Sequence, residues 1–161
     1  MEEISKKLEK IGIHGILAYS YSVYFIAMII GIILHYSLQN DYFGNNESRV
    51  WGLWLLIAAT VLIFWAQKTS AGTHKVREEN KDKNITHHFK KGPYIFSRSP
   101  THIGLFLALI GFGQMINSLF MIALAVIAYL VSHSSFVNKQ EILLEKKYSE
   151  SYKDYKKSVK L

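Results

Sequence analysis

The chain alternates between long uncharged, mostly apolar blocks and short polar stretches. Lys, Arg, Asp and Glu are absent from residues 11–38, 50–66 and 101–138. A membrane-spanning helix needs roughly 20 apolar residues, with about 17 as the lower limit. The first block is therefore long enough for one tilted span, the second lies near the limit, and the third has room for two short spans.

The third block contains a polar break at "QMINS", residues 114–118. An Asn-Ser pair can turn the chain and cap the helix that follows. We therefore predict four transmembrane helices, the last two forming a tight hairpin: about 12–38, 50–67, 101–115 and 118–137.

The predicted fold class is all-α, a polytopic membrane protein in which residues 1–161 form a single domain. The first apolar block is too long for a cleaved signal peptide. Residues 1–11 resemble an amphipathic helix lying on the membrane surface. Residues 39–49 are a polar outer loop, and residues 68–100 are a cytoplasmic loop, partly disordered around "KVREENKDKN". Residues 138–161 are expected to form a cytoplasmic helical tail with an aromatic and aliphatic stripe.

The basic residues indicate the topology. Of the 19 Lys and Arg residues, only Arg49 falls in the loops that join helices one to two and three to four. The positive-inside rule therefore places both termini and residues 68–100 in the cytoplasm. Because these basic residues border apolar spans, membrane lipids rather than nucleic acid are the expected partners for the charge of +7. The chain has no cysteine, which excludes a thiol nucleophile and Cys-ligated zinc.

The start of the third helix carries two packing signals. Ser99 is a candidate N-cap and Pro100 a candidate first helical residue. Gly104, Ala108 and Gly111 then fall on one face, where small residues allow another helix to approach closely in lipid.

A polar cluster is expected at the cytoplasmic end of the hairpin, where "GPYIFSRSPTHIG" (92–104) meets "NKQEILLE" (138–145). A helix N-terminus with Arg98 suits a carboxylate, Glu141 suits an ammonium, and Tyr94 suits a flat ring or a cation. Together they match a zwitterionic, aromatic ligand. Simpler roles remain open: snorkelling of Arg98, a solvated Glu141, and a His102 that reaches water from the first helical turn. No metal is expected, because the pair His87-His88 lacks a third ligand at suitable spacing.

The same segments, with the tail "QEILLEKKYSESYKDYKKSVK", resemble the integral-membrane methyltransferases, whose members include isoprenylcysteine carboxyl methyltransferase and the phospholipid N-methyltransferases. The resemblance covers residues 84–161, and residues 1–67 match only in hydropathy. It implies S-adenosylmethionine as cofactor at the cytoplasmic face and a lipophilic, isoprenoid or lipid-like acceptor that enters from the bilayer. Membrane lipids are implied partners, and nucleic acid is not.

The resemblance carries the cofactor site over to individual positions. Glu141 matches the second residue of the family's acidic pair, Leu144 the leucine that follows it, and Tyr152 and Tyr155 the tail tyrosines. The remaining matches are to the family's Gly-x-Tyr and Arg-His-Pro-x-Tyr-x-Gly motifs. The implied cofactor-binding residues are Gly92, Pro93, Tyr94, Arg98, Ser99, Pro100, His102, Gly104, Gln140 and Glu141.

Three positions depart from the family pattern. Ser99 stands where the family has His, His102 stands where it has Tyr, and Gln140 replaces the first acidic residue. The imidazole has thus moved by three positions, close to one helical turn, so that it can point into the same pocket. The implied catalytic residues are Arg98, which could orient a carboxylate acceptor, and His102, which could take a proton from an amine or hydroxyl acceptor.

Two alternatives stay open beside the methyltransferase. Sterol reductases share a similar carboxyl-terminal half and bind a nicotinamide cofactor, although they are much larger. A non-catalytic member of the same scaffold would explain Ser99 and Gln140. The acceptor and the oligomeric state do not follow from the sequence.

Overall fold

The computed structural model of the protein describes residues 2–38, 46–79, 91–137, 139, 141–142 and 159. Every regular element in these ranges is helical, in agreement with the predicted all-α class. The elements are α1 (Glu2–Leu38), α2 (Asn46–Glu79), the 3₁₀ turn η1 (Gly92–Ile95), α4 (Pro100–Met115), α5 (Leu119–Ser132) and the π-helical turn η2 (His133–Val137).

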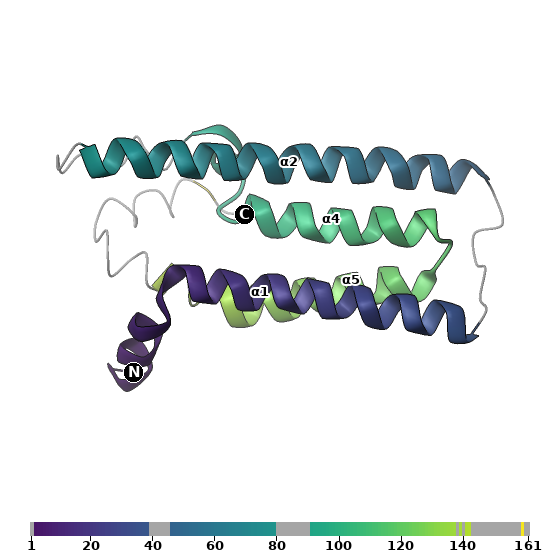
Figure 1. Ribbon diagram of the computed structural model, residues 1–161, viewed down its shortest axis with the longest axis horizontal. Helices are drawn as coiled ribbons and strands as arrows, with labels where there is room; N and C mark the ends of the chain where they lie inside the picture. The colour runs from purple at the N-terminus through teal and green to yellow at the C-terminus, as the bar shows by residue number, and fades with distance from the viewer. Residues whose placement is uncertain are drawn as a thin grey trace.

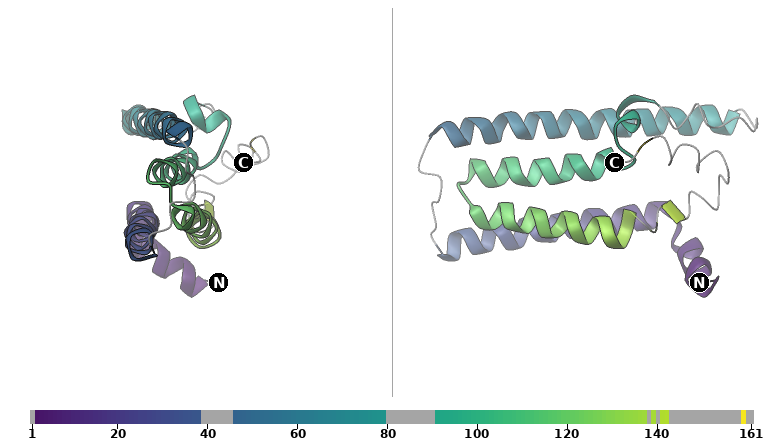
Figure 2. Two further views of the ribbon diagram at one scale, coloured as in Figure 1. Left: turned by 90° about the vertical axis from the view of Figure 1, so that its right-hand side faces the viewer. Right: turned by 180° about the vertical axis from the view of Figure 1, so that it is seen from behind.

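The long helices run back and forth along one axis (Figure 1). α2 packs mainly against α4, α1 packs mainly against α5, and α4 also packs against α5. The end-on view in Figure 2 shows the α4–α5 hairpin next to both outer helices. The hydrophobic core of the bundle contains Tyr24 and Ala27 of α1, Leu109 of α4, and Met121 and Ala125 of α5.

Two helices are long and apolar enough to cross a membrane: Ala18–Leu38 and Asn46–Ser70. Their apolar side chains largely point away from the protein, for example Trp51, Trp54 and Phe64, each more than 60% exposed. Such exposed apolar surface is expected of helices that face lipid. The third and fourth predicted spans are apolar helices of 16 and 14 residues, with bounds close to the predicted ones.

The predicted break between the last two spans is confirmed in detail. α4 ends at Met115, and Asn117 adopts a positive φ of 57°. Asn is one of the few residues that tolerate this conformation at low cost. Ser118 then caps α5, because its Oγ accepts a hydrogen bond from Met121 N at 3.3 Å.

The small-residue stripe is confirmed as a helix contact. A Cβ on Gly111 would lie 2.8 Å from the Gly52 carbonyl oxygen, and a Cβ on Gly52 would lie 2.6 Å from the Gly111 carbonyl oxygen. The backbones of α2 and α4 thus touch at this point, and Gly52 was not predicted to take part in the contact.

The loop prediction over residues 68–79 is wrong, because α2 continues to Glu79. Ala, Lys, Arg and Glu are common in this stretch and favour helix, so the helical hydrogen bonds continue beyond the apolar segment. The helix predicted over residues 1–11 is continuous with α1 from residue 2, and Figure 1 shows it bent away from the rest.

Part of the predicted tail can be placed. Lys139, Glu141 and Ile142 are helical, and Val159 is buried. The other residues of the tail, the predicted loop residues 39–45 and 80–90, and therefore His87, His88 and Gln140 lie outside the described residues.

Candidate functional site

The segment that leads into α4 is anchored on α2. Gly92 has a φ of 57°, and a Cβ there would lie 2.6 Å from Thr69 Oγ1 and 3.2 Å from Trp65 Nε1. Pro93 is buried and occupies the start of η1. Since only glycine combines this φ with this close approach at low cost, the Gly-Pro pair fixes where η1 sits on α2.

Tyr94 follows on η1 and is partly buried. Burial raises the pKa of the Tyr94 phenol above its usual value, and hydrogen bonds to Ser70 and Thr101 oppose that shift. The phenol is therefore neutral at physiological pH and can donate one hydrogen bond.

The start of α4 differs in one respect from the prediction. Ser99 is at the N-cap position and Pro100 is the first helical residue, but the Ser99 side chain makes no capping hydrogen bond. Instead the backbone N–H of Ser99 donates to Ser97 Oγ at 3.2 Å, and the N–H groups of His102 and Ile103 donate to the Ser99 carbonyl oxygen. Because Pro100 has no N–H, this helix N-terminus offers fewer free donors than predicted.

Arg98 and Glu141 form an ion pair, with 2.6 Å between Nη1 and Oε1. The two residues come from the two sequence segments that were expected to meet, so this part of the prediction is confirmed. Their side chains are 18% and 12% exposed, which shields the pair from solvent while leaving an edge accessible. Removing one partner of such a pair leaves the other charge uncompensated in a partly dry site.

His102 lies on a different side of α4, facing α1 and α5. Its Nδ1 is 3.1 Å from Ser20 Oγ, and Ser20 Oγ donates a hydrogen bond to Ser132 Oγ at 3.3 Å. Tyr24 OH donates to the His102 carbonyl oxygen at 3.4 Å. Among the described residues no contact joins the imidazole to Arg98 or Glu141, so the structure does not bring the two implied catalytic residues together.

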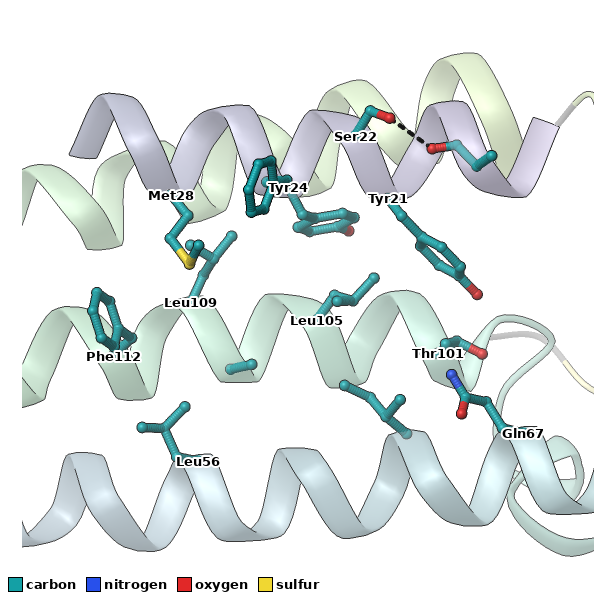
Figure 3. Close-up of a pocket in the computed structure, with 14 residues that line it drawn as sticks. Tyr21, Ser22, Tyr24, Met28, Leu56, Gln67, Thr101, Leu105, Leu109 and Phe112 are labelled. Carbon is teal, nitrogen blue, oxygen red and sulfur yellow. Dashed lines mark hydrogen bonds between the residues drawn. The ribbon is translucent and has the colours of Figure 1, made fainter. Parts of the chain in front are cut away.

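A groove of about 710 Å³ opens between α1, α2 and α4 (Figure 3). Tyr21, Gln67 and Thr101 form one end of it, beside the start of α4. The opposite end contains Met28, Leu56 and Phe112. The rest of the lining is apolar apart from Ser22 and Tyr24: Ala18, Phe25, Ile63, Leu105, Ala108 and Leu109.

The shape and polarity of the groove suit an elongated apolar ligand. The apolar chain of the ligand would lie among the aliphatic and aromatic side chains. Its polar head would lie near Thr101, which is three residues after Arg98. None of the described lining residues carries a charge. The described residues also contain no cluster of three or more His, Asp or Glu side chains that could hold a metal ion.

Several of these residues were missed by the sequence analysis. Tyr21 and Gln67 line the polar end of the groove, and Ser20 contacts both Ser132 and His102. The available signal was a polar side chain within an apolar helix, which is often functional in a membrane protein. That signal does not tell which of the scattered serines and tyrosines face the protein interior.

Comparison with protein families identifies a family that the chain matches. The family described as phospholipid methyltransferase matches residues 47–151, which includes α2, η1, α4, α5 and Glu141. The match extends further toward the N-terminus than the motifs alone, and it ends before Tyr152 and Tyr155. Searches of curated proteins and of solved structures found no match.

Proposed function

Because the chain belongs to the phospholipid methyltransferase family, we propose that it is a membrane enzyme that transfers a methyl group from S-adenosylmethionine to a lipophilic acceptor at the cytoplasmic face. The observation that carries the proposal is the Arg98–Glu141 ion pair, which joins the segment before α4 to the segment after η2. The family match and the exposed apolar helices support a methyltransferase that works in a membrane.

The residues present fit the amino-acid end of the cofactor. That end carries one ammonium and one carboxylate, and the site offers one carboxylate and one guanidinium 2.6 Å apart. Glu141 would hold the ammonium and Arg98 the carboxylate, so each buried charge would keep a partner of opposite sign when the pair opens. When bound, the sulfonium cofactor supplies a methyl group that is already activated for transfer.

The neighbouring residues would shape the rest of the cofactor site. Tyr94 offers a neutral phenol and a ring face, and Gly92 and Pro93 hold it against α2. Ser99 and Pro100 place Arg98 immediately before α4. Gly104 acts through helix packing, since a Cβ there would lie 2.5 Å from Ile63 Cγ1 of α2. Gln140, which directly precedes Glu141 in the sequence, would be a further cofactor-binding residue.

The acceptor would bind in the groove. An isoprenoid or acyl chain would be buried against apolar side chains, which favours binding by about 25 cal/mol per Å² of apolar surface removed from water. Its polar head would meet Thr101 and Gln67, near the segment that carries Arg98. The protein would then align the acceptor atom with the methyl group and exclude water, which is the main requirement of a reaction with so reactive a donor.

Binding of S-adenosylhomocysteine to the purified protein, measured by calorimetry, tests the proposal. We expect micromolar binding by the wild type and binding about 10-fold or more weaker in Glu141→Gln, because a hydrogen bond between charged groups contributes about 1.5–3 kcal/mol. Glu47→Gln is the matched control, since Glu47 is an exposed carboxylate in the first turn of α2. A folded wild type that releases no heat would refute the proposal and leave a non-catalytic member of the family.

A further inference from the structure

The turn η1 exposes large apolar side chains at one end of the bundle. Ile95 is 51% exposed and Phe96, directly after η1, is 73% exposed, whereas Pro93 and Ser97 are buried. The backbone of the turn is hydrogen-bonded, because the N–H groups of Phe96 and Ser97 both donate to the Pro93 carbonyl oxygen at 3.2 Å. The turn therefore has an inner side that packs on α2 and an apolar outer side.

The turn lies beside a stripe of exposed apolar side chains on α2. Trp54, Val61 and Trp65 are exposed and follow one another at spacings of seven and four residues, which places them on one face of the helix. The opposite face contains Gly52 and Ile63, which lie against α4. We call the three exposed residues the lipid-facing stripe, because in a membrane protein such a surface is covered by lipid.

η1 sits at the end of this stripe, where the apolar span of α2 ends. A Cβ on Gly92 would lie 3.2 Å from Trp65 Nε1, and the span long enough to cross a membrane ends at Ser70. Figure 2 shows the turn level with α2 and away from α1. Two exposed lysines flank the turn: Lys68, one helical turn after Trp65, and Lys91, directly before η1. Trp and basic side chains at the end of a span are typical of the boundary between headgroups and acyl chains.

We propose that η1 is a membrane-surface anchor, in which Ile95 and Phe96 insert between the headgroups and acyl chains of the leaflet at this end of the bundle. Lys68 and Lys91 contact anionic headgroups, whose negative potential attracts basic side chains close to the membrane. Lipid covers the turn, rather than a second copy of the chain, because its apolar surface continues the lipid-facing stripe and is bordered by these lysines. The paired backbone of the turn allows it to enter this boundary at low cost. The proposal does not depend on methyl transfer.

Spin labels test the insertion, because the chain has no native cysteine that would also react. Phe96→Cys and Lys91→Cys are labelled separately in phosphatidylcholine vesicles. Collision of each label with oxygen, which concentrates in lipid, is compared with collision with a nickel chelate, which stays in water. We expect the Phe96→Cys label to collide mainly with oxygen, as a label on Val61→Cys in the stripe should, and the Lys91→Cys label mainly with the chelate. Phe96 and Lys91 are both exposed on the protein, so the membrane is what distinguishes them.

The other results would overturn the proposal. If the chelate reached the Phe96→Cys label as readily as the Lys91→Cys label, the turn would lie in water. Protection from both reagents would mean that protein covers it, and broadening of the spectrum by a second label would identify a second copy of the chain. Ile95→Cys gives an independent measurement on the same turn, and an unchanged thermal unfolding midpoint shows that each labelled protein is folded.

The role of the lysines is tested by changing the lipid. When part of the phosphatidylcholine is replaced by phosphatidylglycerol, the label of Phe96→Cys should lie deeper, with a higher ratio of oxygen to chelate collisions. Adding Lys68→Gln and Lys91→Gln together should abolish this rise. Arg49→Gln is the matched control, since it removes an exposed basic side chain near the opposite end of α2 and should keep the rise. No rise at all, or a rise that persists without the two lysines, would refute their contact with anionic headgroups.

Discussion

At the scale of single residues, Gly92 shows how a backbone requirement supports the candidate site. Its φ of 57° belongs to the left-handed region, and its Cα faces Thr69 and Trp65 of α2. A side chain there meets both a conformational penalty and a steric one. Because Tyr94 and Arg98 follow within six positions, the placement of both depends on this contact.

We predict that Gly92→Ala lowers the free energy of unfolding by about 1–3 kcal/mol, the range for strained backbone conformations. It should also weaken binding of S-adenosylhomocysteine, because η1 must move away from α2. Thermal unfolding and calorimetry in detergent measure the two effects. Ile95→Ala is the control: Ile95 is on the same turn and is 51% exposed, so its truncation should change both quantities less. Equal effects of the two substitutions would contradict this account of η1.

Some of the site residues could be predicted because the signal is local. The backbone preferences of glycine and proline alone predict the turn at Gly92-Pro93 and the helix start at Pro100. The contact between Arg98 and Glu141 follows from the tight helical hairpin that separates them in the sequence. The partners of His102 could not be predicted in this way. Ser20 is 82 positions from His102 and 112 positions from Ser132, so their contact depends on how three helices are rotated about their axes. The absence of a side-chain bond from Ser99 likewise depends on Ser97, which holds the Ser99 amide.

At the scale of helices, the contact between α2 and α4 depends on two glycines. The atoms nearest to a Cβ on Gly111 are the Gly52 carbonyl oxygen and the Leu56 nitrogen, at 2.8 and 3.0 Å. Both are backbone atoms in regular helix, so they cannot move without separating the two helices. Gly104 is on the same face, but its nearest neighbour at 2.5 Å is Ile63 Cγ1, a side-chain atom that is not held in the backbone hydrogen bonds of α2.

We therefore predict that Gly111→Ala destabilises the protein by about 1–3 kcal/mol, the usual cost of overpacking, and more than Gly104→Ala does. The two variants add the same methyl group to the same helix against the same partner helix. The comparison of their thermal unfolding midpoints thus separates a backbone clash from a side-chain clash. Similar midpoints would mean that α2 and α4 do not approach as closely as their glycines indicate.

The turn between α4 and α5 makes a second prediction at this scale. Ser118→Ala removes the hydrogen bond from Met121 N to Ser118 Oγ and should cost about 1 kcal/mol, the typical value for an N-cap. Ser134→Ala should cost less, because Ser134 is exposed and its hydroxyl donates to the carbonyl oxygens of Leu130 and Val131, which precede it on the chain. Equal losses in the free energy of unfolding would show that Ser118 has no special role.

The boundary between α4 and α5 could be predicted from the sequence, whereas the end of α2 could not. The break at residues 114–118 was predictable because two neighbouring residues cause it: Asn117 tolerates a positive φ, and Ser118 caps the next helix. The end of α2 was predicted 12 residues too early, because hydropathy marks where the lipid ends and not where the backbone hydrogen bonds end. A helix whose residues favour helix can continue beyond its apolar segment, as α2 does through residues 68–79.

At the scale of the whole molecule, the bundle places the groove's polar end, the Arg98–Glu141 pair and the start of α4 at one end of the helices. The α4–α5 turn and the start of α2 are at the other end (Figure 1). Nearly all basic residues flank the first of these ends along the sequence, and Arg49 alone flanks the second. The positive-inside rule then predicts that the Arg98–Glu141 pair faces the cytoplasm.

This orientation can be measured directly, because the chain has no native cysteine. Glu47→Cys introduces a single thiol at an exposed position at the start of α2. Lys91→Cys introduces one at an exposed position directly before η1, at the other end of the bundle. A membrane-impermeant maleimide should label the thiol at position 47 in intact cells and the thiol at position 91 only after the membrane is opened. Labelling of both thiols in intact cells would show that residues 46–70 do not span the membrane. The reverse pattern would place Arg98 and Glu141 on the outer face, and would contradict the proposed cytoplasmic site even if the purified protein bound S-adenosylhomocysteine.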